Sequence, residues 1–222
     1  MSGTGVSVHL VPALVHGRML VREAGAAASC GVLVGFHGYM ETAAMQMDRL
    51  MAIPGSRAWT LVAIQALNRF YLGRTREVVA GWMTREDREA AIADNINYVD
   101  AALDGVPHDE RTPFVYAGFS QGVAMAFRAA VRGRRPGRGV IAIGGDVPPE
   151  LLADVTASIP ATLLTRGRND DWFTQPRLDA DVSALAARGV AVRALVHEGA
   201  HEWTDAVSAA AGAWLDALLP GF

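Results

Sequence analysis

Short apolar segments alternate with longer amphipathic segments along most of this chain. Residues 31–36 and 114–117 have the length and composition of buried strands. The amphipathic segments repeat their apolar residues at the spacing of helices that cover a sheet. Strands that alternate with helices pair in parallel, because each helix carries the chain back across the sheet. We therefore predict an α/β fold with a mostly parallel central sheet and helices on both of its faces.

The order of the segments is regular except near the N-terminus and in one central stretch. The strands are expected at 31–36, 59–64, 114–117, 140–143, 161–164 and 191–196, and the helices at 41–51, 84–103, 121–131, 176–187 and 202–219. Residues 6–11 and 18–22 alternate apolar and polar side chains around Gly17, which predicts an N-terminal antiparallel hairpin. Residues 68–79 fit neither period and are expected to be irregular, and Thr84 is expected to cap the helix that follows.

The composition excludes several classes of protein. Half of the residues are apolar (51%), which is enough for a large core, and we expect one domain over residues 1–222. The net charge of −3 gives no reason to expect a nucleic-acid partner. The single cysteine, Cys30, excludes an intrachain disulfide. Because the sequence has no secretory signal and no segment of the length of a membrane span, we expect a cytoplasmic protein.

The pattern Gly118-Phe-Ser-Gln-Gly122 is the most informative motif of the chain. It is a G-x-S-x-G sequence that follows a predicted strand and opens a predicted helix. That context is typical of a nucleophile elbow, in which a tight turn exposes the serine oxygen above the sheet. Glycine on both sides of Ser120 allows the neighbouring backbones to approach closely. We therefore predict that Ser120 is a nucleophile.

A nucleophilic serine needs a histidine base and an acid that orients the base. Two histidines, His197 and His201, follow Ser120 in the chain, and His201 lies in a loop between the last strand and the last helix. His197 ends the strand itself and is interpreted as structural. The acid is expected in the loop after the preceding strand, where the sequence offers Asp170, which we favour, and Asp171.

Asp146 is a further alternative for the acid. It follows the strand at 140–143, one strand earlier than the other two candidates. The sequence leaves all three aspartates open, and carboxylates in loops often only cap helices or bind solvent.

The segment 35–39 follows a central strand and precedes a helix. In a fold with a nucleophile elbow, this loop supplies one backbone amide of the oxyanion hole, and the residue after the nucleophile supplies the other. We therefore expect the amides of Tyr39 and Gln121 to bind the developing oxyanion. His37 is expected to bind loop backbone.

Together these motifs resemble the α/β-hydrolase fold, and within it the phospholipase/carboxylesterase family of small serine esterases and acyl thioesterases. The matching segments are Phe36-His-Gly38, Gly118-Phe-Ser-Gln-Gly122, Gly167-Arg-Asn-Asp170 and Gly199-Ala-His201, in the order of the family. The resemblance implies a triad of Ser120, Asp170 and His201, no cofactor and no metal. It also implies a small-molecule ester or thioester substrate. A homodimer stays open.

The sequence departs from the family in several places, which weakens any transfer of its substrates. Val123 stands where the family often has a second glycine after the elbow, and Met40 and Glu41 replace a Gly-Asp pair. Methionine and aromatic side chains near the expected site suit an acyl pocket. We expect Met40, Trp82 and Trp172 to contact substrate, because each adjoins a loop of the site.

Two other functions compete with this interpretation. His197-Glu-Gly-Ala-His201 matches H-E-x-x-H, a zinc motif that requires both histidines on one face of a helix. The preceding residues alternate like a strand and Gly199 disfavours a helix, so zinc is the weaker hypothesis. The second alternative is a non-catalytic protein of the same fold that only binds a ligand. A complete set of serine, acid, histidine and oxyanion loop favours catalysis.

Overall fold

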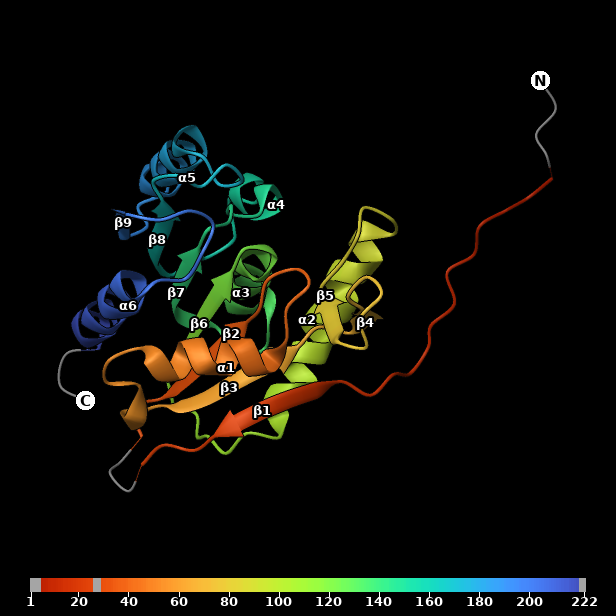
Figure 1. The fold of residues 1–222 in the computed structure, drawn as a ribbon, viewed down its shortest axis with the longest axis horizontal. Helices are drawn as coiled ribbons and strands as arrows, with labels where there is room; N and C mark the ends of the chain where they lie inside the picture. The colour runs from red at the N-terminus through yellow and green to blue at the C-terminus, as the bar shows by residue number, and fades with distance from the viewer. Residues whose placement is uncertain (1–4, 26–28, 220–222) are drawn as a thin grey trace.

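The computed structural model describes residues 5–25 and 29–219, and a seven-stranded sheet forms the centre of this part of the chain (Figure 1). The order of the strands is β1-β3-β2-β6-β7-β8-β9, and neighbours pair in parallel except for β1 with β3. The strands are β1 (Arg18–Arg22), β2 (Val32–Phe36), β3 (Thr60–Gln65), β6 (Phe114–Phe119), β7 (Gly137–Ile143), β8 (Ala161–Gly167) and β9 (Val192–His197). The predicted mostly parallel sheet is confirmed.

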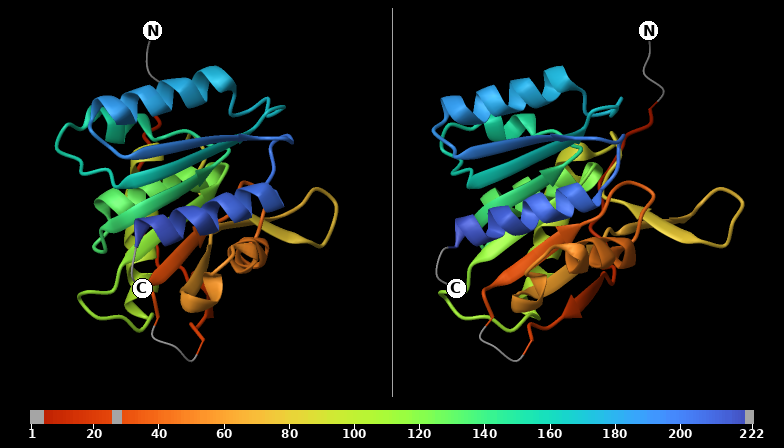
Figure 2. Two further views of the ribbon diagram at one scale, coloured as in Figure 1. Left: turned by 90° about the vertical axis from the view of Figure 1, so that its left-hand side faces the viewer. Right: turned by 60° about the vertical axis from the view of Figure 1, so that its left-hand side comes forward.

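Helices cover both faces of this sheet. The helices are α1 (Ala43–Ala52), α2 (Arg88–Asp104), α3 (Gln121–Arg132), α4 (Pro149–Ala153), α5 (Gln175–Ala187) and α6 (Asp205–Leu218), with a 3-10 turn at Ser56–Ala58. One hydrophobic core joins the sheet to α2, α3, α4 and α5, and the other joins it to α1 and α6. Figure 2 shows α1 and α6 on the same side of the sheet. No helix of the described residues is both long enough and apolar enough to cross a membrane.

Alternation within the central strands explains why their sequences are apolar throughout. All five residues of β2 are buried. Val34 and Phe36 belong to the core beneath α2 and α3, and Leu33 belongs to the core beneath α1 and α6. A strand covered on both faces has no solvent-facing side, so polar residues would lose hydration at every position.

The predicted N-terminal hairpin is wrong. β1 pairs antiparallel with β3, where Arg18 lies opposite Gln65, and residues 6–11 form no strand. Val6 and Val8 are more than 80% exposed, and the segment runs away from the sheet in Figure 1. β1 packs Met19 and Leu20 against the two cores, whereas residues 6–11 are all exposed and bury no side chain that would hold them on the free edge of β1.

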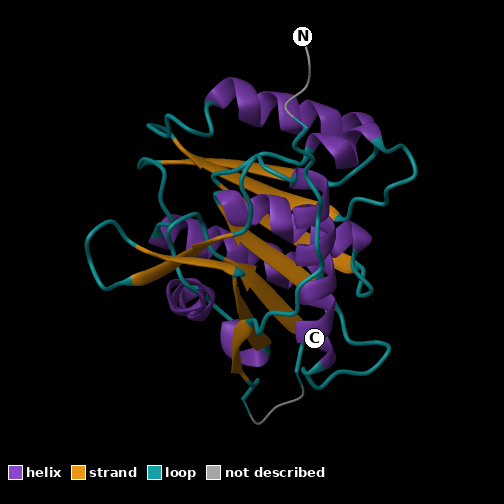
Figure 3. Cartoon of the chain, turned by 90° about the vertical axis from the view of Figure 1, so that its right-hand side faces the viewer, coloured by secondary structure: helices purple, strands orange, loops and turns teal. Residues whose placement is uncertain are grey.

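The stretch at 68–79, expected to be irregular, begins a second, two-stranded sheet. β4 (Asn68–Tyr71) pairs antiparallel with β5 (Val78–Gly81), and Figure 3 shows this hairpin projecting from the main sheet. The amide of Leu72 donates to the carbonyl of Glu77 and closes the turn at 2.9 Å. The hairpin is largely exposed on one side, so its sequence carries no strong apolar period.

The long helix begins later than predicted. α2 starts at Arg88, and its N-cap Asp87 has a φ of 47° and makes no capping hydrogen bond through its side chain. Thr84 instead accepts a hydrogen bond from the amide of Glu86 at 3.2 Å, within the loop before the helix. This local bond competes with the expected cap.

Candidate active site

Ser120 lies in a strained turn between β6 and α3. Its φ of 52° and ψ of −120° place it outside the usual regions for an L-residue, which costs about 1–3 kcal/mol. Its amide donates to the carbonyl of Ile143 at 2.8 Å. A Cβ on Gly118 would overlap the backbone of Gly122, and a Cβ on Gly122 would overlap the carbonyl of Phe36. The two glycines are therefore required by close backbone contact.

His201 bridges Ser120 and Asp170. Its Nε2 lies 2.8 Å from Oγ of Ser120, and its Nδ1 lies 2.8 Å from Oδ2 of Asp170. Because an ionised carboxylate only accepts, Nδ1 carries the proton and Nε2 is free to accept the serine proton. The ring of His201 also packs on that of Phe119, with centroids 5.1 Å apart. The structure thus brings together the three residues that the motifs nominated.

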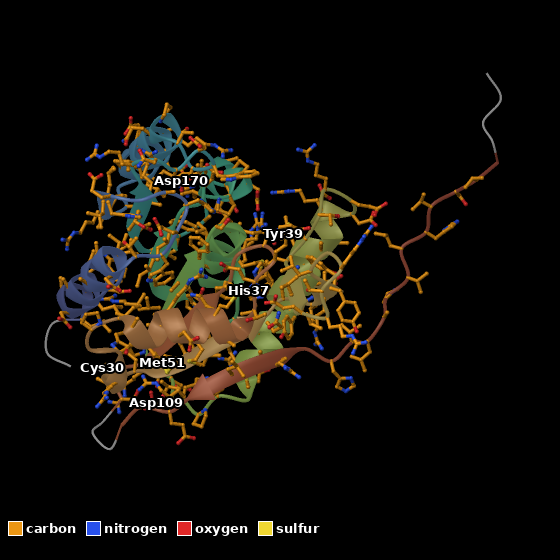
Figure 4. The ribbon with its side chains drawn as sticks, viewed as in Figure 1. Cys30, His37, Tyr39, Met51, Asp109 and Asp170 are labelled. Carbon is orange, nitrogen blue, oxygen red and sulfur yellow. The ribbon has the colours of Figure 1, made fainter. Side chains whose placement is uncertain are left out.

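All of these residues lie at the carboxyl ends of parallel strands. Ser120 follows β6, Asp170 follows β8 and His201 follows β9, whereas His37 and Tyr39 follow β2. Figure 4 labels Asp170, His37 and Tyr39 on these loops. In an open parallel sheet this edge is where ligands bind, because the loops converge there.

The loop that carries Asp170 is held by its own carboxylate and by a buried arginine. Oδ1 of Asp170 accepts the amides of Trp172 and Phe173 at 2.8 and 2.9 Å, which leaves Oδ2 for His201. Arg166, only 5% exposed, donates to the carbonyls of Asp170 and Phe173. Sequence reasoning missed Arg166, because a strand arginine gives no sign that it will turn inward.

Asp171 and Asp146, the other candidates for the acid, lie elsewhere. Asp171 is exposed. Oδ1 of Asp146 lies 3.2 Å from Nε of Arg177, and burial raises the pKa of Asp146. The geometry therefore favours Asp170 as the partner of His201.

The loop after β2 is fixed by several hydrogen bonds. Nε2 of His37 accepts the amide of Ala66 at 3.0 Å, so Nδ1 donates to the carbonyl of Gly38 at 2.7 Å. Burial lowers the pKa of His37, which keeps the ring neutral. The carboxylate of Glu41 accepts the amide of Gly38 at 2.7 Å. Arg49 in turn pairs with both oxygens of Glu41, at 2.6 and 2.7 Å.

Glu41 and Arg49 were also missed in the sequence, because their ion pair joins a loop to a helix and follows no short spacing.

The amides of Tyr39 and Gln121, which we expect to bind an oxyanion, donate to no acceptor within residues 5–25 and 29–219. The Gln121 amide belongs to the first turn of α3, where N–H groups have no partner in the helix.

A cavity of about 290 Å³ opens beside Ser120 and His201. Trp172 lines it and is 75% exposed, in keeping with its predicted position. Met40 and Trp82 do not line it. Met40 is exposed at a turn with a φ of 63°.

Trp82 needs a correction, because it is fully buried and cannot touch a substrate in this structure. Its Nε1 donates to the carbonyl of His37 at 2.9 Å, and its amide donates to Oε1 of Gln121 at 2.8 Å. Adjacency to a loop of the site suggested contact with substrate, but the indole instead supports that loop from below.

Near the cavity, Asp181 of α5 is buried and accepts the amide of Val147 at 2.9 Å. Burial raises the pKa of Asp181 to about 6.

The zinc hypothesis fails on geometry. His197 ends β9, and residues 198–203 are not helical. The two histidines therefore do not share a helical face, as the H-E-x-x-H mechanism needs. His201 is also engaged with Asp170 and Ser120.

No family model and no curated protein matches this sequence. Solved structures do match. Esterase PE8 has a TM-score of 0.77 and 21% identity, over 92% of this chain and 100% of that chain. Acyl-protein thioesterase 2 of Zea mays has a TM-score of 0.70 and 18% identity, over 92% and 100%. The carboxylesterase of Bacillus cereus has a TM-score of 0.71 and 13% identity, over 91% and 94%.

At these identities the likeness concerns the fold, which extends over nearly the whole length of both chains in each comparison. The mostly parallel sheet, its antiparallel edge strand and the helices on both faces agree with it. The chain therefore has the α/β-hydrolase fold, which it shares with these small esterases and thioesterases.

Proposed function

We propose that this chain is a serine hydrolase that cleaves carboxylic esters or thioesters through an acyl-enzyme on Ser120. The observation that carries the proposal is the pair of 2.8 Å contacts that join His201 to Ser120 and to Asp170. The fold shared with esterases and thioesterases supports it. A protein that only binds a ligand has no need of this arrangement.

The reaction follows from the directions of the hydrogen bonds. His201 takes the proton of Ser120 through Nε2 as Oγ attacks the acyl carbon, and then gives that proton to the leaving alcohol or thiol. Asp170 keeps Nδ1 protonated and stabilises the imidazolium. Water, activated by His201, attacks the acyl-enzyme and releases the acid.

The amides of Tyr39 and Gln121 hold the oxyanion in this proposal. Both lie at the carboxyl edge of the sheet, and neither has an acceptor among the described residues. Each donor to an oxyanion contributes about 2.7–4 kcal/mol to lowering the barrier. No step requires a cofactor.

The test uses an active-site phosphonate together with two serine variants. The phosphonate should label the chain once, at Ser120, and Ser120→Ala should lower kcat on a good ester by at least about 10⁴-fold. Ser183→Ala is the matched control, because Ser183 is exposed on α5, where its hydroxyl donates to the carbonyl of Asp179. An Ser120→Ala enzyme that keeps about a tenth of the activity would refute the proposal.

A further inference from the structure

Arginine lines the part of the cavity that lies furthest along α3 from Ser120. Gln121, Ala124 and Arg128 all line the cavity, and their spacing of three and four positions puts them on one face of the helix. With a rise of 1.5 Å per residue, Arg128 lies about 10 Å along the axis from Gln121. The cavity thus extends from the serine to a guanidinium, and the small Ala124 side chain occupies little of the space between them.

Arg128 is buried and incompletely bonded to oxygen. Its side chain is 3% exposed, and its Nε and Nη2 both lie 2.8 Å from Oε1 of Glu150. Nη1 meets Sδ of Met83 at 3.7 Å, and a thioether is a weak acceptor. Burial lowers the pKa of Arg128, because the charged form loses hydration. Nη1 has no oxygen acceptor among the described residues, so a carboxylate that reached it would supply a strong one.

Two further arginines line the same cavity, Arg88 and Arg177. Nη2 of Arg88 lies 3.1 Å from Glu150, and Nε of Arg177 lies 3.2 Å from Asp146. Among the described residues that line this cavity or pair with its arginines, three cations, including Arg128, therefore face two carboxylates. The three arginines therefore share two carboxylate partners, and the nearby carboxylate of Asp170 is bound to His201 instead.

We propose that this cavity binds a carboxylate of the substrate, so that the favoured esters or thioesters carry an acid group on the part that enters it. The inference rests on the hydrolase function proposed above and names its substrate class. Arg88 and Arg128 share one carboxylate partner, Glu150, so a substrate carboxylate can bind beside them, and its planar oxygens suit a guanidinium.

The first experiment compares paired substrates with the wild-type chain. On the acyl side, 4-nitrophenyl hemiadipate is compared with 4-nitrophenyl hexanoate. On the leaving-group side, 4-carboxyphenyl acetate is compared with 4-carbamoylphenyl acetate, and spontaneous hydrolysis is subtracted with Ser120→Ala. One of the two acidic substrates should have a kcat/KM about tenfold above its neutral partner, as a charge-assisted hydrogen bond predicts. Two ratios at or below unity would overturn the inference.

Charge variants then locate the effect. Arg128→Gln and Arg88→Gln should each lower the ratio of kcat/KM for the acidic to the neutral substrate, and Arg128→Gln should lower it by about tenfold. Glu150→Gln should raise the ratio, because it removes a competing carboxylate. Arg193→Gln is the control, since Arg193 is exposed on β9 and lies outside the cavity.

If Arg128→Gln does not fold, Arg88→Gln and Glu150→Gln still give shifts of opposite sign. A ratio that stays constant in every soluble variant would contradict the assignment. Competition by adipate and by inorganic phosphate identifies the anion, and stronger inhibition by phosphate would overturn the choice of a carboxylate.

The two proposals fail in distinguishable ways. Hydrolysis of neutral esters and phosphonate labelling of Ser120, without preference for acid, would overturn this inference alone. Failure of every ester and of the labelling would overturn the hydrolase. In that case calorimetric titration with adipate, in the wild-type chain and in Arg128→Gln, decides whether the cavity binds a carboxylate.

Discussion

Replacing Asp170 with asparagine tests the proposed triad most sharply, because the change preserves the loop while it reverses one hydrogen bond. The asparagine oxygen can still accept the amides of Trp172 and Phe173, now 2.8 and 2.9 Å from Oδ1. The NH₂ group then faces Nδ1 of His201 in place of the carboxylate oxygen that lies 2.8 Å away. Since that NH₂ group donates, it forces the ring proton onto Nε2, which can no longer accept from Ser120.

The expected loss is about 10⁴ in kcat, the effect of the same replacement in a serine protease, which corresponds to about 5 kcal/mol of barrier. The thermal midpoint should change little, because the loop keeps its backbone hydrogen bonds. Steady-state kcat is measured on a 4-nitrophenyl ester across a range of pH, with the rate of phosphonate labelling as a second readout.

Asp171→Asn and Asp146→Asn are the matched controls, and each should lower kcat by less than about tenfold. If Asp146→Asn proved the damaging change and Asp170→Asn stayed near wild type, the acid would belong to the loop after β7. The assignment of Asp170 would then be refuted, although a serine hydrolase would remain.

The remaining predictions concern stability and the support of the site. Asp181 holds its proton more tightly in the folded state, with a pKa of about 6 against 3.8. Its contribution to the free energy of unfolding therefore falls as the pH rises from about 4 to about 6. Asp181→Asn should therefore raise the free energy of unfolding at pH 8 by up to about 3 kcal/mol and change it little at pH 4, in urea titrations. Gly122→Ala should prevent folding or lower stability by several kcal/mol, because its Cβ would overlap the carbonyl of Phe36; a wild-type thermal midpoint would contradict this. Trp82→Phe removes the donor to the carbonyl of His37 and should cost about 1 kcal/mol of stability, with kcat reduced more than KM is changed. Unaltered kcat would show that the indole does not support the loop.

Much of the fold and of the candidate site could be predicted because the signals are local. The apolar composition of the central strands predicts them directly. The two glycines that flank Ser120 predict the tight turn that a nucleophilic serine needs. Asp170 and His201 can be predicted from their positions, because each lies in the loop that follows a parallel strand, and these loops meet at the carboxyl edge of the sheet. These inferences use neighbours in sequence.

Contacts between distant segments could not be predicted in the same way. Arg166, Glu41 and Arg49 owe their roles to partners across loops, so their own surroundings in the sequence carry no sign of them. Trp82 misled for the related reason that a residue next to a site loop can point into the core beneath it. The N-terminal hairpin was predicted wrongly because alternation of apolar and polar residues indicates a strand but not the strand with which it pairs.

The β4–β5 hairpin is joined to the loop of Tyr39 by two backbone hydrogen bonds. The amide of Met40 donates to the carbonyl of Ala80, and the amide of Ala80 donates to the carbonyl of Glu41, each at 3.0 Å. Segments linked in this way open as one cooperative unit. The exchange of the Ala80 amide with deuterium therefore reports the opening of the loop that carries Tyr39. Hydrogen exchange in the β4–β5 hairpin thus measures whether the site is intact.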